Sequence, residues 1–242
     1  MDYYAQGAPS DSVFVHGAGG NNLLWKRSLQ YLSGPRAAFA VNLPGHPSGA
    51  VACRTVEEYA EAVRGFVSEV GLRKVVVCGH SMGSAIALAL ALAHPDTVKG
   101  LVLVGGGAKL GVAPSILDGL SSQPLKAIEE IITPMSFHRV SLEMGREARA
   151  ALSLSNLAVF LNDYSACNGF DVREKLSRIS VPTMIVCGED DRMTPPKFSQ
   201  YLNAHIPGSS VFLIPEAGHM VPLEKPAALG GLVQSFLSRL SP

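Results

Sequence analysis

The sequence lacks a hydrophobic run long enough to cross a membrane. Its longest unbroken apolar stretch runs from Ala85 to Ala93, whereas a helix that spans a bilayer needs about 18–20 apolar residues. The first residues, Met1-Asp2-Tyr3-Tyr4, include neither a basic segment nor an apolar one, so we expect no secretory signal. Both features favour a cytoplasmic protein that does not bind membranes.

An excess of charge of one sign is also absent. Twenty Lys and Arg residues balance 20 Asp and Glu residues. Proteins that bind nucleic acids or membrane surfaces usually carry a basic excess or a basic cluster, so neither is an expected partner. Of the 242 residues, 47% are hydrophobic and 17% are charged, a composition that excludes disorder and fits one large globular unit.

Cysteine is scarce, and its spacing forms no motif. No two of Cys53, Cys78, Cys167 and Cys187 are spaced as Cys-x-x-Cys, the pattern of many zinc and redox sites. The sequence also contains no G-x-G-x-x-G motif and no P-loop lysine motif for a nucleotide. We therefore expect four reduced thiols, no metal and no cofactor.

Short apolar runs alternate with helix-like segments along most of the chain. Six such runs resemble strands, at residues 12–15, 37–41, 74–78, 100–104, 182–187 and 210–214. Consecutive apolar positions are typical of parallel strands that are covered by helices on both faces. The fold class is therefore α/β, and Tyr3-Tyr4 is a candidate for a further strand, which would bring the mostly parallel sheet to about seven strands.

Three helices can be placed between or after these runs. Thr55 and Glu58 form a capping-box pattern before a periodic apolar segment that ends at Gly71. A second helix is predicted from Met82 to about Ala93, and a third from about Pro226 to Leu240.

One stretch breaks the alternation. Between Gly107 and Asp171 the sequence contains helix-like pieces separated by Pro114, Pro124 and Pro134, and no convincing strand. Such an insertion is typical of a helical lid over one end of a sheet. The expected division is a core of residues 1–107 and 171–242 with a helical cap of residues 108–170.

Ser81 is the candidate nucleophile. It lies in Gly79-His80-Ser81-Met82-Gly83, a G-x-S-x-G motif between a predicted strand and a predicted helix. A serine at such a sharp turn takes strained backbone angles, and glycine is required on either side because a Cβ atom would collide with the crossing chain.

A serine nucleophile needs a base that is oriented by an acid. Of the seven histidines, His219 is the candidate base, because it follows a strand and stands in a loop with glycine. The acid is expected in the carboxylate cluster Glu189-Asp190-Asp191, which follows the predicted strand at residues 182–187. We favour Asp191, and we expect Asp190 either to support the loop or to meet Arg192. The order Ser81, Asp191, His219 is the one that this layout requires.

Two backbone N–H groups must stabilise the negative charge that develops on the substrate oxygen. One is expected from Met82, directly after the nucleophile, and the other from Ala18 in the glycine-rich loop His16-Gly17-Ala18-Gly19-Gly20. His16 and His80 are interpreted as supporting histidines rather than metal ligands.

Together these motifs resemble the α/β-hydrolase family over nearly the whole chain. The resemblance implies that Ser81 attacks an acyl carbonyl, that His219 transfers the proton and that Asp191 orients the imidazole ring. It also implies oxyanion donors at Ala18 and Met82. The sequence departs from the family pattern in two places. The first strand that is usual in the family is missing, and the loop at residues 42–48 is unusual.

The resulting hypothesis is a serine hydrolase, a monomer or homodimer, that cleaves small or medium-chain apolar esters or lactones. Eight apolar cap residues motivate this substrate class, and they are Met135, Phe137, Met144, Leu152, Leu154, Leu157, Phe160 and Leu161. Arg139, Arg146 and Arg149 could instead bind an anionic substrate. An enol-lactone hydrolase, a C–C bond hydrolase, a thioesterase or a perhydrolase would use the same triad, and a ligand receptor of this fold would also be compatible with it.

Overall fold

The computed structural model describes residues 1–8, 10–47, 49–139 and 156–240. Within this part of the chain a mostly parallel, seven-stranded sheet has the order β1-β3-β2-β4-β5-β6-β7. The strands are β1 (Tyr3–Ala8), β2 (Ser12–Val15), β3 (Arg36–Val41), β4 (Val75–His80), β5 (Val98–Val104), β6 (Thr183–Gly188) and β7 (Ser210–Ile214). All neighbours are parallel except β1, which pairs antiparallel with β3.

Alternate residues of the central strands point to opposite faces of the sheet, as the period of a strand requires. In β4, Val75 and Val77 belong to one buried apolar cluster, while Val76 and Cys78 belong to another. The sheet therefore separates two cores, and both faces must be covered by helices.

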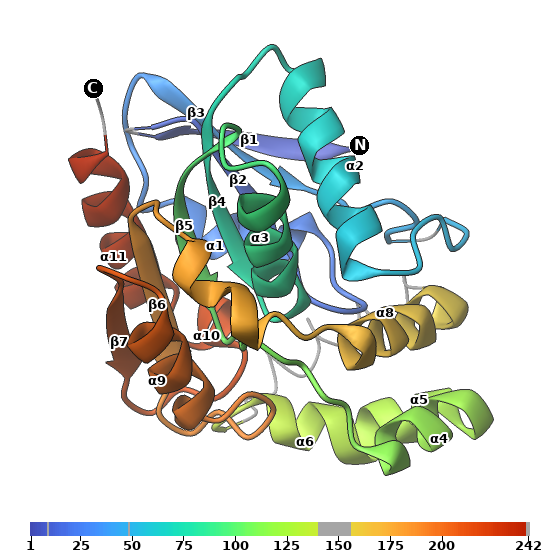
Figure 1. Ribbon diagram of the computed structural model, residues 1–242. Coiled ribbons are helices and arrows are strands. Elements are labelled where there is room, and N and C mark those ends of the chain that lie inside the picture. Colours follow the sequence, from blue (N-terminus) through green and yellow to red (C-terminus); the bar gives the residue numbers. More distant parts are fainter. Residues whose placement is uncertain (9, 48, 140–155, 241–242) are drawn as a thin grey trace.

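Two groups of helices cover these faces (Figure 1). The first face is covered by α2 (Val56–Glu69), α3 (Met82–Ala93), α9 (Pro196–His205) and the 3-10 helix η3 (Arg173–Arg178). The second face is covered by the 3-10 helix η1 (Asn22–Trp25), α1 (Lys26–Leu29), α10 (Val221–Glu224) and α11 (Pro226–Arg239). The result is the three-layer arrangement expected for a parallel sheet.

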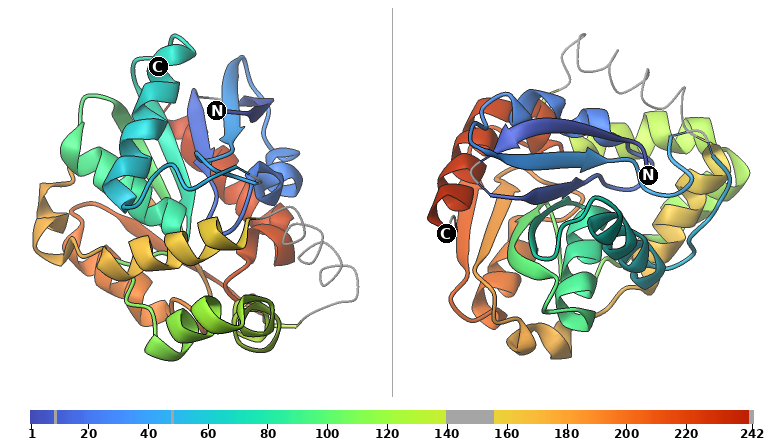
Figure 2. Two further views of the ribbon diagram at one scale, coloured as in Figure 1. Left: turned by 90° about the vertical axis from the view of Figure 1, so that its right-hand side faces the viewer. Right: turned by 90° about the horizontal axis from the view of Figure 1, so that it is seen from above.

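The described part of the inserted segment is helical. It contains α4 (Pro114–Ser122), α5 (Pro124–Ala127), the π-helical turn η2 (Ile128–Ile132), α6 (Thr133–Ser136) and α8 (Leu157–Gly169). These helices lie together beyond the carboxyl ends of the central strands (Figure 2). They share a small apolar cluster that includes Ile116, Leu120, Phe160 and Tyr164.

The sequence predictions of the α/β fold, of about seven strands and of the three helices are confirmed. The N–H of Glu58 donates to Thr55 Oγ1, as a capping box requires, but the Glu58 carboxylate accepts from the N–H of Arg54 rather than from Thr55. All four cysteines are free and buried, and Cys78 and Cys187 lie on β4 and β6, two places apart in the sheet.

Close packing of α3 against the end of β2 gives a test of the fold. A Cβ atom on Gly83 would lie 2.3 Å from the Val15 carbonyl oxygen, whereas one on Gly65, inside α2, would meet nothing within 4 Å. Gly83→Ala should lower the free energy of unfolding by about 1–3 kcal/mol, and Gly65→Ala should raise it by about 0.5–1 kcal/mol. Urea unfolding measures both values, and effects of the same sign would contradict the packing described.

Candidate active site

The order of the strands places a crevice between β2 and β4. The chain leaves β2 to form β3 on one side, and β4 and β5 lie on the other side. Ligand sites of open α/β sheets form where the strand order reverses in this way, at the carboxyl ends of the strands. Here the loops that follow β2 and β4 carry Ala18 and Ser81 to the same point.

Ser81 occupies a strained turn between β4 and α3. Its backbone φ is 54° and its ψ is −116°, a conformation that is costly for a residue other than glycine. A Cβ atom on Gly79 would lie 2.1 Å from the Gly83 carbonyl oxygen. The two flanking positions are therefore restricted to glycine, as the motif predicts, and the half-buried Ser81 side chain stands at the start of α3.

His219 and Asp191 form a buried pair. His219 Nδ1 lies 2.8 Å from Asp191 Oδ2, and the two side chains come from the loops after β7 and β6. Asp191 Oδ1 accepts hydrogen bonds from the backbone N–H groups of Met193 and Thr194 at 2.9 and 2.8 Å. Since the carboxylate can only accept, Nδ1 carries the proton of the His219 ring, and Nε2 is then free to accept one.

Thr194 is a third member of this group that sequence reasoning missed. Its Oγ1 lies 2.8 Å from the Gly105 carbonyl oxygen, 2.9 Å from Asp191 Oδ2 and 3.1 Å from His219 Nδ1. Burial raises the pKa of the Asp191 carboxyl, but the nearby His219 and the hydrogen bonds from His219 and Thr194 outweigh it, so that the pKa is lowered. Asp191 therefore remains ionised at neutral pH.

The two expected supporting histidines hydrogen-bond to backbone atoms. His16 Nε2 accepts from the N–H of Leu43 at 3.1 Å, and its Nδ1 donates to the Gly17 carbonyl oxygen at 2.8 Å. His80 Nε2 donates to the carbonyl oxygen of His219 at 2.9 Å. Burial lowers the pKa of each ring to about 3, and a neighbouring histidine adds to the effect, so both rings are neutral supports.

Ala18 lies in the loop beside Ser81, and Met82 is the first residue of α3. A Cβ atom on Gly17 would be 3.0 Å from Ser81 Cβ, so the loop after β2 packs directly on the serine. Among the described residues no hydrogen bond engages the N–H of Ala18 or of Met82.

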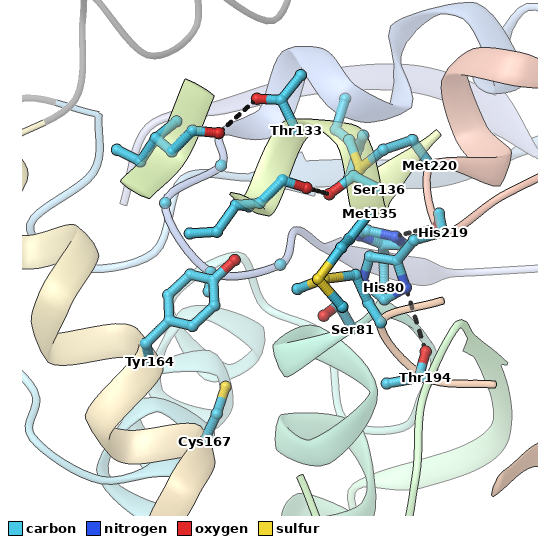
Figure 3. Close-up of a pocket in the computed structure, with 18 of the residues that line it drawn as sticks. His80, Ser81, Thr133, Met135, Ser136, Tyr164, Cys167, Thr194, His219 and Met220 are labelled. Carbon is cyan, nitrogen blue, oxygen red and sulfur yellow. Dashed lines mark hydrogen bonds between the residues drawn. The ribbon is translucent and has the colours of Figure 1, made fainter. Parts of the chain in front are cut away.

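Ser81 and His219 open into a cavity of about 540 Å³, a size typical of small-molecule sites. Figure 3 shows them on one wall, with Tyr164 and Cys167 of α8 across from them. Most of the lining is apolar, and includes Leu110, Ile116, Ile128, Met135, Phe137 and Phe160. Lys26 and Arg27 also line the cavity, and sequence reasoning missed both.

The expected cap residues divide into four groups. Met135, Phe137 and Phe160 line the cavity, whereas Leu157 and Leu161 pack against the small apolar cluster of the inserted helices. Five further candidates, Met144, Arg146, Arg149, Leu152 and Leu154, lie outside the described residues. Arg139 is exposed.

The loops that carry Asp191 and His219 are joined to the end of α6. Asp190 pairs with His138 at 2.8 Å, instead of meeting Arg192, which donates to the backbone carbonyls of Pro134 and Phe137. The Glu224 carboxylate accepts from the N–H of His138 at 2.7 Å and from that of Gly218 at 2.8 Å. These contacts fix one wall of the cavity to the histidine loop.

A second buried carboxylate, Asp163 on α8, also escaped the sequence analysis. It accepts from the N–H of Gly19, from His46 and from Tyr59. One signal for it was available, because Asp163 is the single charged residue of the otherwise neutral helix at 157–169.

The described residues include neither a metal-binding cluster nor a membrane-spanning helix. They contain no cluster of three or more His, Cys, Asp or Glu side chains arranged to bind a metal ion. Nor is any described helix both long and apolar enough to cross a membrane.

Comparisons with known proteins show the family to which this chain belongs. A pimeloyl-(acyl-carrier protein) methyl ester esterase from Neisseria meningitidis is 27% identical over 238 residues, covering 92% of this chain and 91% of the relative. A 2-hydroxy-6-oxononadienedioate/2-hydroxy-6-oxononatrienedioate hydrolase from Pseudomonas putida is 30% identical over 254 residues, covering 93% and 86%. The solved structure of a thermophilic esterase superposes with a TM-score of 0.83 at 33% identity, covering 98% of this chain and 94% of the other. The family model described as the alpha/beta hydrolase family matches residues 13–230, and the chain belongs to that family of hydrolases.

Proposed function

We propose that this chain is a serine hydrolase that cleaves carboxylic esters or lactones through an acyl-enzyme intermediate, with Ser81 as nucleophile, His219 as base and Asp191 as orienting acid. The observation that carries the proposal is the strained turn at Ser81, which opens into the same cavity as a His219 ring held by Asp191 at 2.8 Å. A merely structural turn would need neither the strain nor the buried pair.

The chemistry follows from the protonation of His219. Its Nε2 accepts the Ser81 hydroxyl proton as Ser81 Oγ attacks the carbonyl carbon of the ester. The tetrahedral intermediate then collapses, the bond to the alcohol oxygen breaks, and His219 returns the proton to that oxygen. His219 then takes a proton from a water molecule, whose oxygen attacks the acyl carbon. The bond from that carbon to Ser81 Oγ breaks, the acid leaves, and His219 returns the proton to Ser81 Oγ. Asp191 stays ionised throughout and stabilises the imidazolium form of His219.

The negative oxygen of the tetrahedral intermediate would be bound by the N–H groups of Ala18 and Met82. Both are unengaged among the described residues, and Met82 stands at the N-terminus of α3, where the helix dipole also favours negative charge.

An apolar cavity of about 540 Å³ supports an ester or lactone with a small or medium acyl group. We propose that residues 108–170 form a cap over the core of residues 1–107 and 171–242, since their described helices supply much of the apolar lining. The names of the Neisseria relative and of the thermophilic structure support an ester substrate. Four buried free thiols fit a reducing compartment, for which we propose the cytoplasm.

A second candidate function is the hydrolysis of an anionic substrate by the same triad. The substrate would be an enol-lactone, or an oxo-acid that is cleaved at a C–C bond. Two observations favour it: Lys26 and Arg27 line the cavity, and a relative at 30% identity is named as a dienedioate hydrolase. A ligand receptor of this fold would be distinguished by single-turnover retention of its ligand.

Ser81→Ala should abolish turnover of p-nitrophenyl esters, with a fall in kcat of about 10³-fold or more. The wild type should show a burst of p-nitrophenol equal to the enzyme concentration, because the activated ester acylates Ser81 faster than water releases the acid, so that the acyl-enzyme accumulates. Stopped-flow measurements on acetate, butyrate and octanoate esters test both points and give the chain-length preference. Equal turnover by the wild type and by Ser81→Ala would refute the mechanism.

Thr194→Val should lower kcat by about 10-fold with little change in KM. The variant keeps the shape of the side chain but removes a hydroxyl that supports both Asp191 and His219, and one lost hydrogen bond of about 1.4 kcal/mol corresponds to that factor. Thr194→Ser is the matched control, since it restores the hydroxyl. Steady-state kinetics on one ester compare the variants, and equal losses in both would show that the methyl group matters instead.

Asp191→Asn should lower the free energy of unfolding at pH 7 by about 1–3 kcal/mol. A lowered pKa in the folded state means that the ionised carboxylate stabilises the protein above the ordinary Asp pKa of about 3.9. This stabilisation is lost as the pH falls through the lower, folded value. The difference between wild type and variant should therefore narrow below about pH 4, as urea titrations at several pH values would measure. A difference that stayed constant would contradict the assigned ionisation.

A further inference from the structure

A second buried carboxylate has no role in the proposed reaction. Asp163, on α8, has a relative exposure of 0%. Burying an ionised carboxylate costs several kcal/mol unless donors surround it. Here three donors do, and they come from three other parts of the chain.

The donors converge as follows. The N–H of Gly19 and His46 Nε2 lie 2.9 and 2.8 Å from Asp163 Oδ2, and the Tyr59 hydroxyl lies 2.7 Å from Oδ1. Gly19 belongs to the loop after β2, His46 to the loop after β3, and Tyr59 to α2. One carboxylate thus ties the inserted helix α8 to the core.

The bond to Gly19 reaches the loop that carries Ala18. The N–H of Gly20 donates to the Gly17 carbonyl oxygen at 3.1 Å, which closes a four-residue turn. Gly19, its third residue, has φ 63°, while Ala18 is not in the positive-φ region. This is the pattern of a type II turn, which differs from type I in the orientation of the central peptide. That peptide joins Ala18 to Gly19, and Asp163 accepts its N–H.

Phe160 strengthens the same contact from one turn earlier on α8. A Cβ atom on Gly19 would lie 2.0 Å from the Phe160 ring, so the ring packs flush on this glycine. Residues three apart share a face of a helix, and both Phe160 and Asp163 therefore face the turn. The helix fixes the turn by packing and by a charged hydrogen bond together.

We propose that Asp163 is a positioning residue for the oxyanion site. It holds the Ala18–Gly19 peptide in its type II orientation and so anchors the turn that presents the N–H of Ala18 to the oxygen that becomes negative. This inference rests on the proposed function. In this way α8 affects the rate of the hydrolysis reaction as well as covering the cavity.

Three variants test the proposal. Asp163→Leu removes the acceptor and should lower kcat by roughly 10- to 100-fold, less than the loss of a whole oxyanion donor, with KM changed by less than about 2-fold. Asp163→Asn can keep an oxygen at the Oδ2 position, while the Tyr59 hydroxyl turns to accept from the amide. It should therefore retain most of kcat.

Asn162→Ala is the matched control for stability. Asn162 donates to the Cys53 carbonyl oxygen at 2.7 Å and also interacts with the Tyr59 side chain, so it anchors α8 to the core. None of its hydrogen bonds among the described residues reaches the turn. This variant should lower Tm and leave kcat, counted per Ser81 titrated in the burst, near the wild-type value. Equal losses of kcat in Asn162→Ala and Asp163→Leu would overturn the positioning role.

A crystal structure of Asp163→Leu supplies a readout that does not depend on turnover. The Ala18–Gly19 peptide should be reoriented there, and an unchanged turn would overturn the proposal. If Asp163→Leu does not fold, the double variant Asp163→Leu/His46→Leu replaces the pair by apolar groups and carries the same two expectations. If the wild-type protein shows no Ser81-dependent turnover, the proposed function is refuted. The crystal structure of Asp163→Leu would then still show whether Asp163 holds the turn.

Discussion

The site depends on one close crossing of backbone, where the start of α3 passes over the end of β2. A side chain at Gly83 would collide with the end of β2 and one at Gly79 with the first turn of α3, and Ser81 between them takes up the backbone strain. The Ser84 hydroxyl, which donates to the carbonyl oxygens of Gly79 and Val104, fastens the same turn to β4 and β5. Core packing on both sides of the sheet is what holds this conformation in place.

The remaining groups reach that crossing from loops at the same edge of the sheet. The carboxyl ends of β2, β4, β6 and β7 supply the glycine-rich loop, Ser81, Asp191 and His219 in turn. Because the strands are parallel and in register, short loops suffice to bring residues far apart in the sequence together. Supporting histidines then hold the loops through backbone atoms, His16 on one side of the crossing and His80 on the other.

Much of this could be predicted from the sequence, because strands and glycine turns are local signals. The strand before Ser81 and the helix after it could be identified from consecutive apolar residues, and the motif between them has few alternative conformations. Asp163, Thr194 and Lys26 could not be predicted in the same way. Their places in the site result from the packing of distant segments, as in the contact between Asp163 and Gly19, 144 residues apart, which no local pattern encodes. Arg192 illustrates the same limit, since a neighbouring carboxylate in the sequence was not its partner in space.

The Glu224 carboxylate joins the segment that ends α6 to the loop of His219, through the N–H groups of His138 and Gly218. A Cβ atom on Gly218 would lie 2.6 Å from the His138 nitrogen, so the two segments have no room to slide past each other. For protein engineering this means that a substitution on this side of the cavity is expected to change the substrate range and the reaction rate together. Substitutions that widen the pocket near α6 are expected to shift the loop of His219 as well, whereas the wall formed by α4 can be altered with that loop left in place.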